Sequence, residues 1–343
     1  MQHRLIAAMR REKVDRCPVW FMRQAGRYMP EYQALRQGRS FMEMARSVEL
    51  CTQITLQPVR AFDLDAAILF ADIMTPLEAV GIDFDIVGGE GPVIEEPLTQ
   101  ASQLGRVGSF DAARIGYLFE AIRQIQHELA GQQPLIGFAG APFTMACYLM
   151  EGRGSRDFMQ ARRALYEAPE FFGELLARLV DLQVAYLREQ ARAGVDALQV
   201  FDSWIGLLDG PSYRRVVLPH MRRLFAELSG LGIPVVHFAP GSAAFLESIA
   251  EAGGDVIGVD WRLPLDEAWS RIGADKAVQG NLDPALLLVG GEPLRRGIDE
   301  VLRCAAGRPG HIFNLGHGVH RQTPPSHVAE AVQYLRQVGV AGP

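Results

Sequence analysis

The chain has 343 residues, of which 48% are apolar and 22% charged, and this balance is typical of a globular protein. Its net charge of −6 argues against nucleic-acid binding, and no apolar run reaches the roughly 18–20 residues of a membrane span. The four cysteines form no C-x-x-C pair and the N-terminal segment has too short an apolar core for a signal peptide, so we expect a cytoplasmic protein without disulfides.

Eight short and almost continuously apolar runs recur along the chain. Runs of this kind are typical of strands that are buried on both faces of a parallel sheet. Most of the gaps hold helix-period sequence, as in 169–194 and 219–232, and glycine often precedes the next run, as at a helix C-cap. The runs are PVWFMR (18–23), AAILFAD (66–72), PLIGFAG (134–140), ALQVFDS (197–203), PVVHFAP (234–240), VIGVDW (256–261), AVQGNLD (277–283) and HIFNLGH (311–317).

This alternation predicts the α/β class and, within it, a closed (β/α)8 TIM barrel that forms a single domain over residues 1–343. An open, doubly wound sheet is the alternative. That fold would be expected to carry a glycine fingerprint after its first strand, and the sequence has none. The stretch 81–97 alternates and contains Gly-Gly, which predicts a β-hairpin excursion after the second strand.

The barrel prediction places the site at the C-terminal ends of the strands, where such folds carry their chemistry. The first of these ends holds Arg23, Arg27 and Arg36 in one strand-to-helix region. A planar guanidinium binds a carboxylate through two hydrogen bonds, so several converging arginines suit a substrate with several carboxylates. The alternative is a solvated basic face with structural ion pairs to Glu31 or Glu43.

Asp72 ends the second run without an adjacent positive residue. A partly desolvated carboxylate at this position would have a raised pKa or would need hydrogen-bond donors from a ligand. The alternative is a rim aspartate that caps the next helix.

Later strand ends offer three further candidates. Pro142 suits an early helical position, so Tyr148 is expected one or two turns into that helix, where its hydroxyl can face the barrel mouth. Ser203 lacks a G-x-S-x-G elbow and is interpreted as a hydrogen-bond donor. His317 lies between two glycines, which allow a ligand to approach the backbone closely, although a structural histidine is the alternative.

Metal and cofactor sites are not predicted. A zinc site needs three or four N, S or O ligands, and the segment HFAPG, which begins at His237, has alanine where a thiol ligand would be expected. The sequence contains no fingerprint for NAD, flavin or PLP binding.

Several of these segments together resemble the uroporphyrinogen decarboxylase family. PVWFMRQAGRYMPEY (18–32) is similar to its N-terminal signature and GFAGAPFTMACYLMEG (137–152) to its second, and FADI, QGNLDP and NLGHG follow the same order and spacing. The resemblance covers essentially the whole chain. It implies a (β/α)8 barrel that works as a homodimer without metal or organic cofactor. It also implies a substrate, uroporphyrinogen III, whose four acetate side chains lose their carboxyl groups to give coproporphyrinogen III.

The resemblance also implies roles for individual residues. Asp72 corresponds to the aspartate that binds the pyrrole N–H groups, and we expect it to stabilise a cationic intermediate while the pyrrole acts as its own electron sink. Arg23, Tyr148 and His317 are the further catalytic candidates, and which of the three delivers the proton stays open. The positions that correspond to substrate contacts are Arg23, Gln24, Ala25, Gly26, Arg27, Arg36, Asp72, Tyr148, Ser203 and His317.

Two other functions would share parts of this pattern. A corrinoid or thiol methyltransferase would share the barrel and QGNLDP, and should show a zinc set built on His and Cys. A non-catalytic tetrapyrrole carrier would keep the arginines but could lose Asp72 and Tyr148.

Overall fold

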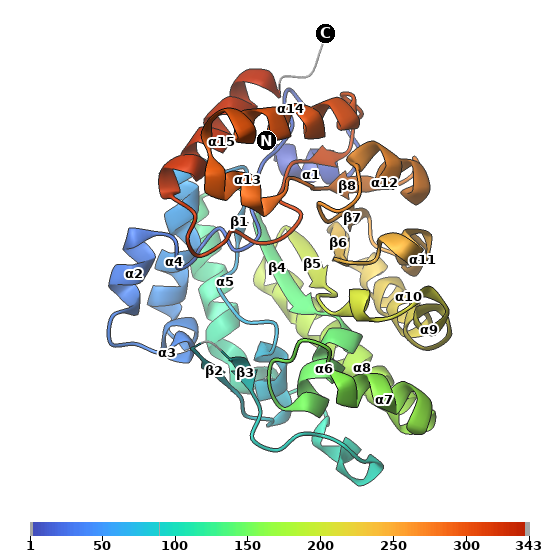
Figure 1. Cartoon of the computed structure of the whole chain (residues 1–343). Helices are drawn as coiled ribbons and strands as arrows, with labels where there is room; N and C mark the ends of the chain where they lie inside the picture. Colours follow the sequence, from blue (N-terminus) through green and yellow to red (C-terminus); the bar gives the residue numbers. More distant parts are fainter. Residues whose placement is uncertain (1–2, 89, 340–343) are drawn as a thin grey trace.

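The computed structural model describes residues 3–88 and 90–339, and its centre is a parallel sheet of seven strands. The sheet order is β1-β4-β5-β6-β7-β8-β9, and every neighbouring pair is parallel. Figure 1 shows these strands at the centre with helices around their outside. The strands are β1 (Ala67–Ile68), β4 (Leu135–Gly140), β5 (Ala197–Phe201), β6 (Val235–Phe238), β7 (Val256–Gly258), β8 (Ala277–Gln279) and β9 (His311–Ile312).

The sheet is strongly curled. Gln279 on β8 donates from Nε2 to Oε1 of Gln199 on β5 at 3.0 Å, although two strands separate β5 from β8 in the sheet. Trp20 donates in turn from its indole Nε1 to Gln279 Oε1 at 3.1 Å. All three side chains are buried. Side chains from non-adjacent strands can meet in this way only if the sheet bends around a shared interior.

Seven of the eight predicted strands are present, and the prediction of a regular strand at 18–23 was wrong. Here only Val19 forms a parallel bridge, to Phe313. The reason is that side chains take the backbone N–H groups that a ladder would use: the Val19 N–H donates to Asp65, the Phe21 N–H to Gln24 and the Met22 N–H to Asn314. Pro18 has no N–H to donate. The segment still lies beside β9, since the Phe313 N–H donates to Pro18 O at 2.9 Å.

The α-helices connect the strands and cover the sheet (Figure 1). The predicted helix at 169–194 is α8, and that at 219–232 is α10 followed by a 3₁₀ turn, Ser229–Leu231. The helices are α1 (Arg4–Met9), α2 (Pro30–Arg36), α3 (Phe41–Arg46), α4 (Val48–Phe62), α5 (Gly116–Leu129), α6 (Pro142–Glu151), α7 (Met159–Glu167), α8 (Pro169–Ala193), α9 (Gly210–Ser212), α10 (Leu218–Leu228), α11 (Leu246–Ala252), α12 (Leu265–Ile272), α13 (Pro284–Val289), α14 (Gly291–Ala305) and α15 (Pro325–Val338).

Helix α8 illustrates how the sequence specifies these elements. Pro169 is its first residue and presets a helical φ, and Gly194 ends it with a φ of 114°, which residues with a side chain rarely adopt. Leu175, Leu179 and Leu182 recur at helical spacing and are buried, and the helix packs against β4 and α10. Burial of one such side chain contributes about 1.5–3 kcal/mol. Among the described helices, none is long and apolar enough to cross a membrane.

A separate two-stranded sheet follows β1. Its strands β2 (Asp85–Val87) and β3 (Gly91–Val93) pair antiparallel, where the alternating pattern predicted a hairpin. The hairpin is attached to the loop after α6, because Val93 bridges Arg153 and the Ile94 N–H donates to Gly152 O at 2.7 Å.

Candidate active site

Arg23 has an unusual backbone conformation at the carboxyl edge of the sheet. Its φ is 60°, in the left-handed region that side chains disfavour. A Cβ placed on Gly318 would lie 2.4 Å from Arg23 Cδ, so the arginine side chain packs directly over this glycine, next to His317. Backbone strain of this kind persists where surrounding contacts hold it, often at functional sites.

The Arg23 guanidinium lies in a recess. Its side chain is exposed to solvent, yet desolvation by the surrounding protein lowers its pKa below the usual 12.5, and Tyr148, Arg27 and Asp72 also act on it. A group that water can reach but that protein atoms largely surround occupies a concave part of the surface. We define the mouth as this recess, formed by Arg23, Asp72, Tyr148 and His317.

Asp72 is half-buried in the mouth. Burial raises its pKa from 3.8 to about 6, while the Met74 N–H and the positive charge of Arg23 act in the opposite direction. Its Oδ1 accepts the Met74 N–H at 2.9 Å, just before a 3₁₀ helix at Thr75–Val80. Asp72 is not the N-cap of that helix, since Met74 occupies that position and the helix has no side-chain cap. The other oxygen, Oδ2, accepts no hydrogen bond from the described residues, so this carboxylate can receive donors from a ligand.

Tyr148 lies on α6, which begins at Pro142 as expected. Its ring packs edge-on against Phe158 at 5.3 Å and Trp204 at 6.1 Å. Burial raises the pKa of Tyr148 to about 12. The phenol is therefore protonated at neutral pH and can donate a hydrogen bond, and the charges of Asp72 and Arg23 both act on it.

His317 follows β9 and is half-buried. Burial lowers its pKa from 6.5 to about 4, and the positive charges of Arg23 and Arg262 lower it further. Its ring stands edge-on to Trp261 at 6.3 Å. The imidazole is consequently neutral at pH 7, and it can donate or accept a hydrogen bond but does not hold an extra proton.

Ser203 follows β5 and is half-buried. Its loop is held by Thr144 on α6, whose hydroxyl donates to Asp202 Oδ1 at 3.1 Å and accepts the Trp204 N–H at 3.3 Å. Ser203 itself makes no hydrogen bond through its hydroxyl within the described part of the chain. This arrangement leaves the hydroxyl available while its backbone is fixed from both sides.

Within the loop after the first run, Gln24 and the arginines have different roles. The Gln24 side chain is buried, accepts the Phe21 N–H and donates to Ala66 O at 2.9 Å, so it shapes the loop and only its backbone could contact a ligand. Ala25 and Gly26 are half-buried between the two arginines. Of the described residues, none forms an ion pair with Arg23, Arg27 or Arg36, although Arg36 is half-buried on α2.

Among the described residues, these arginines do not form the structural ion pairs to Glu31 or Glu43 that were the alternative interpretation. Glu43 instead caps α3, accepting the Ser40 N–H at 2.6 Å. Glu31 forms no ion pair with any described residue and is exposed in the first turn of α2.

His237 lies on β6 but away from the mouth. Its ring packs against Phe225 of α10 at 4.8 Å, on the helix side of the sheet, and both residues are buried. In the part of the chain that the structure describes, no three His, Cys, Asp or Glu side chains are grouped as metal ligands. His237 instead faces Phe225, with its Nε2 4.0 Å from Asp202 Oδ2.

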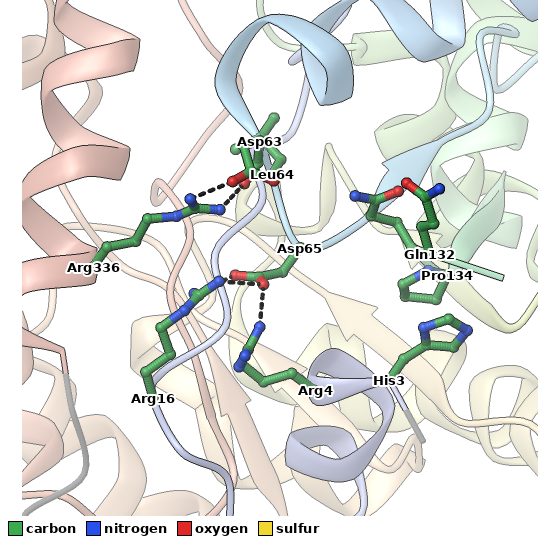
Figure 2. A pocket seen from close by; sticks show the side chains of 10 residues that line it. His3, Arg4, Arg16, Asp63, Leu64, Asp65, Gln132, Pro134 and Arg336 are labelled. Carbon is green, nitrogen blue, oxygen red and sulfur yellow. Dashed lines mark hydrogen bonds and ion pairs between the residues drawn. The ribbon is translucent and has the colours of Figure 1, made fainter. Parts of the chain in front are cut away.

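A hollow lies at the opposite edge of the sheet. It measures about 420 Å³ and lies before the starts of β1 and β4. Figure 2 shows Arg4 and Arg16 directed at Asp65, and Arg336 directed at Asp63. The three arginines that line this hollow therefore already have carboxylate partners.

A family model described as "Uroporphyrinogen decarboxylase (URO-D)" matches residues 1–338. The chain belongs to the uroporphyrinogen decarboxylase family. A relative of that name from Carboxydothermus hydrogenoformans is 49% identical over 98% of this chain and 96% of its own length. Another from Sorangium cellulosum is 47% identical over 98% and 97%. As a member of the uroporphyrinogen decarboxylase family, the chain is a carboxy-lyase of tetrapyrrole biosynthesis.

Solved structures share the fold of this uroporphyrinogen decarboxylase family member at much lower sequence identity. A methyltransferase from Methanosarcina mazei covers 97% of both chains with a TM-score of 0.81 and 19% identity. A B12-independent methionine synthase from Shewanella sp. covers 94% of this chain and 95% of its own with a TM-score of 0.58 and 11% identity. Similarity at this level concerns the fold alone. The choice between decarboxylase and methyltransferase therefore rests on the close sequence relatives.

Sequence reasoning missed one group at the mouth of this uroporphyrinogen decarboxylase family member. Trp261 and Arg262 lie just beyond β7 and beside His317. The run VIGVDW (256–261) marked this strand end, but no motif singles out Arg262, the residue that follows it.

Proposed function

We propose that this chain removes the carboxyl groups from the four acetate side chains of uroporphyrinogen III, giving coproporphyrinogen III, and that the mouth is the site of this reaction. The observation on which the proposal depends is that charged groups at the carboxyl edge of the sheet lack protein partners. Arg23, Arg27 and Arg36 form no ion pair with a described residue, and Asp72 has one carboxylate oxygen to which no described residue donates. An anionic macrocycle with inward N–H groups is complementary to both features.

In this proposal the substrate carboxylates bind to the arginines. Arg23 and Arg27 lie on the loop, with Arg36 on α2, and each guanidinium can offer two parallel N–H donors. The backbone of the loop from Gln24 to Gly26 and the hydroxyl of Ser203 supply further contacts. The macrocycle is thereby held with its pyrrole nitrogens over Asp72.

Asp72 then stabilises the reacting ring. Its pKa of about 6 in the absence of substrate results mainly from burial. Hydrogen bonds from pyrrole N–H groups favour the ionised form and lower that pKa. A fixed carboxylate opposite a developing cation is the kind of preorganised group that contributes a few kcal/mol to catalysis, of the order of 3 kcal/mol.

The reaction needs no external electron sink. Protonation of the α-carbon next to the ring carbon that carries the acetate places positive charge on the pyrrole. The bond to the carboxylate then breaks, CO2 leaves, and the electron pair neutralises the ring and forms an exocyclic methylene. A second proton converts this methylene to methyl and the first proton leaves the ring carbon, so each acetate consumes one proton and releases one CO2.

We propose Arg23 as the source of the ring proton. Tyr148 is a weaker acid than usual because burial raises its pKa to about 12, and His317 holds no extra proton at pH 7 because its pKa is lowered to about 4. Arg23 is cationic, and desolvation moves its pKa in the direction that favours proton release. Tyr148 and His317 then act as hydrogen-bond donors that orient the substrate.

The proposal extends to the domain organisation, the location and the oligomeric state of the protein. Residues 1–343 form one domain in which segment 18–23 closes the sheet into a (β/α)8 barrel. The hydrogen bond from Phe313 to Pro18 on one side and from the Asp65 N–H to Val19 O on the other support this closure. We further propose a cytoplasmic homodimer that needs no metal or cofactor and does not bind nucleic acid. The absence of disulfides among its four cysteines fits a reducing compartment.

Product analysis tests the proposal. The purified chain is incubated anaerobically with uroporphyrinogen III, with and without an excess of chelator, and the products are separated by chromatography. We expect stepwise conversion to the tetracarboxylate at the same rate in both samples. Binding of the substrate without conversion would indicate a carrier and would overturn the proposal, and activity that is restored only by added zinc would overturn the metal-free mechanism.

A further inference from the structure

Asp260 and Trp261, which follow β7, hold the next residue, Arg262, in a fixed position beside the mouth. The Arg262 guanidinium carbon lies 4.1 Å from the centroid of the Trp261 ring. Its Nη1 donates to Asp260 Oδ2 at 2.7 Å. The Arg262 side chain remains 54% exposed, so the stack and the ion pair leave one edge of the guanidinium open to solvent.

Asp260 serves as the anchor of this arrangement. Its carboxylate is 5% exposed, and besides Arg262 Nη1 it accepts the Gly241 N–H at 2.6 Å and the Arg262 N–H at 2.9 Å. Its backbone is fixed as well, since Asn281 Nδ2 donates to Asp260 O at 2.9 Å. With both oxygens occupied, Asp260 is a positioning residue, and it is not available to bind substrate.

Trp261 connects this arrangement to the mouth. Its ring meets the edge of His317 at 6.3 Å. A Cβ on Gly316 would lie 2.3 Å from Trp261 N, so only glycine permits this approach of the loop after β9. Arg262 is also close enough to His317 to lower its pKa, as Arg23 does. The guanidinium is therefore adjacent to the recess in which the substrate is proposed to bind.

The free edge of Arg262 has the chemistry to bind a carboxylate. Nε and Nη2 have no hydrogen-bond partner among residues 3–88 and 90–339. An exposed ion pair alone contributes little stability, whereas a guanidinium held flat on an aromatic ring loses less conformational freedom when it binds a ligand. The arrangement is thus better explained by ligand binding than by support of the fold.

We propose that Arg262, presented by Trp261 and Asp260, binds a carboxylate of the substrate at the mouth beside His317. This inference rests on the proposed function and adds a specificity-determining residue to it. Arg262 holds a side chain of the macrocycle and takes no part in proton transfer, so its loss should weaken binding more than turnover.

Two substitutions test the role of Arg262. R262Q removes both the positive charge and the planar pair of N–H donors. R262K keeps the charge but loses the paired donors. For R262Q we expect KM and the dissociation constant for uroporphyrinogen III to rise about tenfold, as for loss of one charge-assisted contact, with a much smaller change in kcat. R262K should lie between R262Q and wild type. The matched control is R296Q on α14, where Arg296 is exposed and faces Glu292, and its KM should not change.

A second measurement separates this inference from the proposed function. Binding is followed by tryptophan fluorescence under anaerobic conditions, independently of conversion, and thermal unfolding confirms that each variant is folded. Substrate affinity and KM of R262Q equal to wild type would overturn the inference. Failure of the wild type to convert bound substrate would overturn the proposed function instead. NMR titration of His317 should show a higher pKa in R262Q than in wild type, and an unchanged value would place Arg262 too far from the mouth.

Discussion

At the amino ends of the strands, every arginine that lines the large hollow is paired with a carboxylate, whereas at the carboxyl ends Arg23, Arg27 and Arg36 have no such partner among the described residues. Arginine side chains at the two edges of the sheet thus differ in whether they are paired with a carboxylate. At the amino edge their donors are used within the protein. At the carboxyl edge Arg23, Arg27 and Arg36 keep theirs available, and Arg262 pairs with Asp260 through one edge of its guanidinium only.

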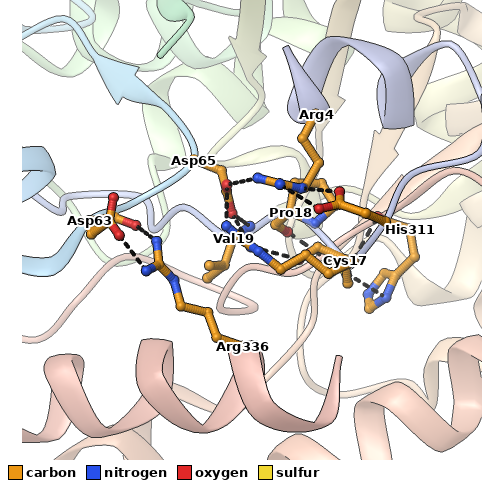
Figure 3. Close-up of polar contacts among 10 residues, drawn as sticks. Arg4, Cys17, Pro18, Val19, Asp63, Asp65, His311 and Arg336 are labelled. Carbon is orange, nitrogen blue, oxygen red and sulfur yellow. Dashed lines mark hydrogen bonds and ion pairs between the residues drawn. The ribbon is translucent and has the colours of Figure 1, made fainter. Parts of the chain in front are cut away.

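Asp65 and Asp72 show the same contrast for carboxylates. Figure 3 shows Asp65 at the centre of a network in which it accepts Arg4 Nη1 at 2.8 Å, two donors of Arg16 at 2.7 Å each, and the Val19 N–H at 2.9 Å. From the described residues, the Asp72 carboxylate accepts a single donor, the Met74 N–H. Asp65 and Asp72 therefore differ in how far protein donors saturate them, which fits a structural role for Asp65 and the proposed ligand-binding role for Asp72.

The substitution Asp72→Asn should cause the largest functional effect. We expect kcat to fall at least 100-fold, which corresponds to removal of one preorganised charge. The free energy of unfolding should not decrease, because burial of the ionised carboxylate is unfavourable and the amide removes that penalty. Chromatographic turnover assays and urea denaturation measure the two quantities. A variant with near-normal kcat would contradict the role of Asp72.

The substitution Asp65→Asn should show the reverse behaviour. Arg4 and Arg16 would lose their shared carboxylate, and we expect the free energy of unfolding to fall by about 3 kcal/mol, as when one partner of a buried ion pair is removed. The kcat of the folded protein should stay close to wild type. Denaturant unfolding followed by circular dichroism measures the loss, and a change in kcat with intact stability would invalidate the division between the two edges.

The substitution Arg27→Gln tests whether an arginine without an ion pair binds the substrate. Because the Arg27 side chain has no ion pair within the described chain, its loss should leave the free energy of unfolding unchanged. We expect KM for uroporphyrinogen III to rise about tenfold with a smaller effect on kcat. Arg39→Gln is the control, since Arg39 is exposed and donates to the Leu35 backbone. Equal KM values in both variants would argue against a role in substrate binding.

The substitution Arg336→Ala should have the smallest effect. Arg336 pairs with Asp63, whose side chain is 67% exposed, and exposed pairs contribute about 0–1 kcal/mol. Steady-state kinetics should give an unchanged KM. A rise in KM would indicate that the amino-edge hollow participates in function.

Much of the fold could be predicted because its signals are local. Continuous apolar runs identified the seven strands of the sheet, and Pro142 and Gly194 marked the start of α6 and the end of α8. Segment 18–23 could not be predicted correctly, because its backbone donors are taken by Asp65 and Asn314, which lie 46 and 292 residues further along the chain.

The sequence indicated some residues of the candidate site but not all of them. Strand ends indicated Asp72 and His317, and the structure places both near Arg23 at the carboxyl edge of the sheet. Two features depend on tertiary packing that no local pattern reveals. Gln24 turns inward to bond Ala66, and Arg262 lies beside the mouth because the adjacent Trp261 packs against His317.

The pH dependence of kcat/KM tests the central claim, that the ionised carboxylate of Asp72 works at the mouth, most directly. Burial raises the pKa of Asp72 to about 6, so kcat/KM should fall as the pH drops through 6, because the free enzyme then protonates this carboxylate. His317 has a pKa of about 4 and stays neutral in this range. The account predicts an acid limb near pH 6 in both the wild type and His317→Gln. A profile that stays flat down to pH 5, or a limb that disappears in His317→Gln, would contradict it.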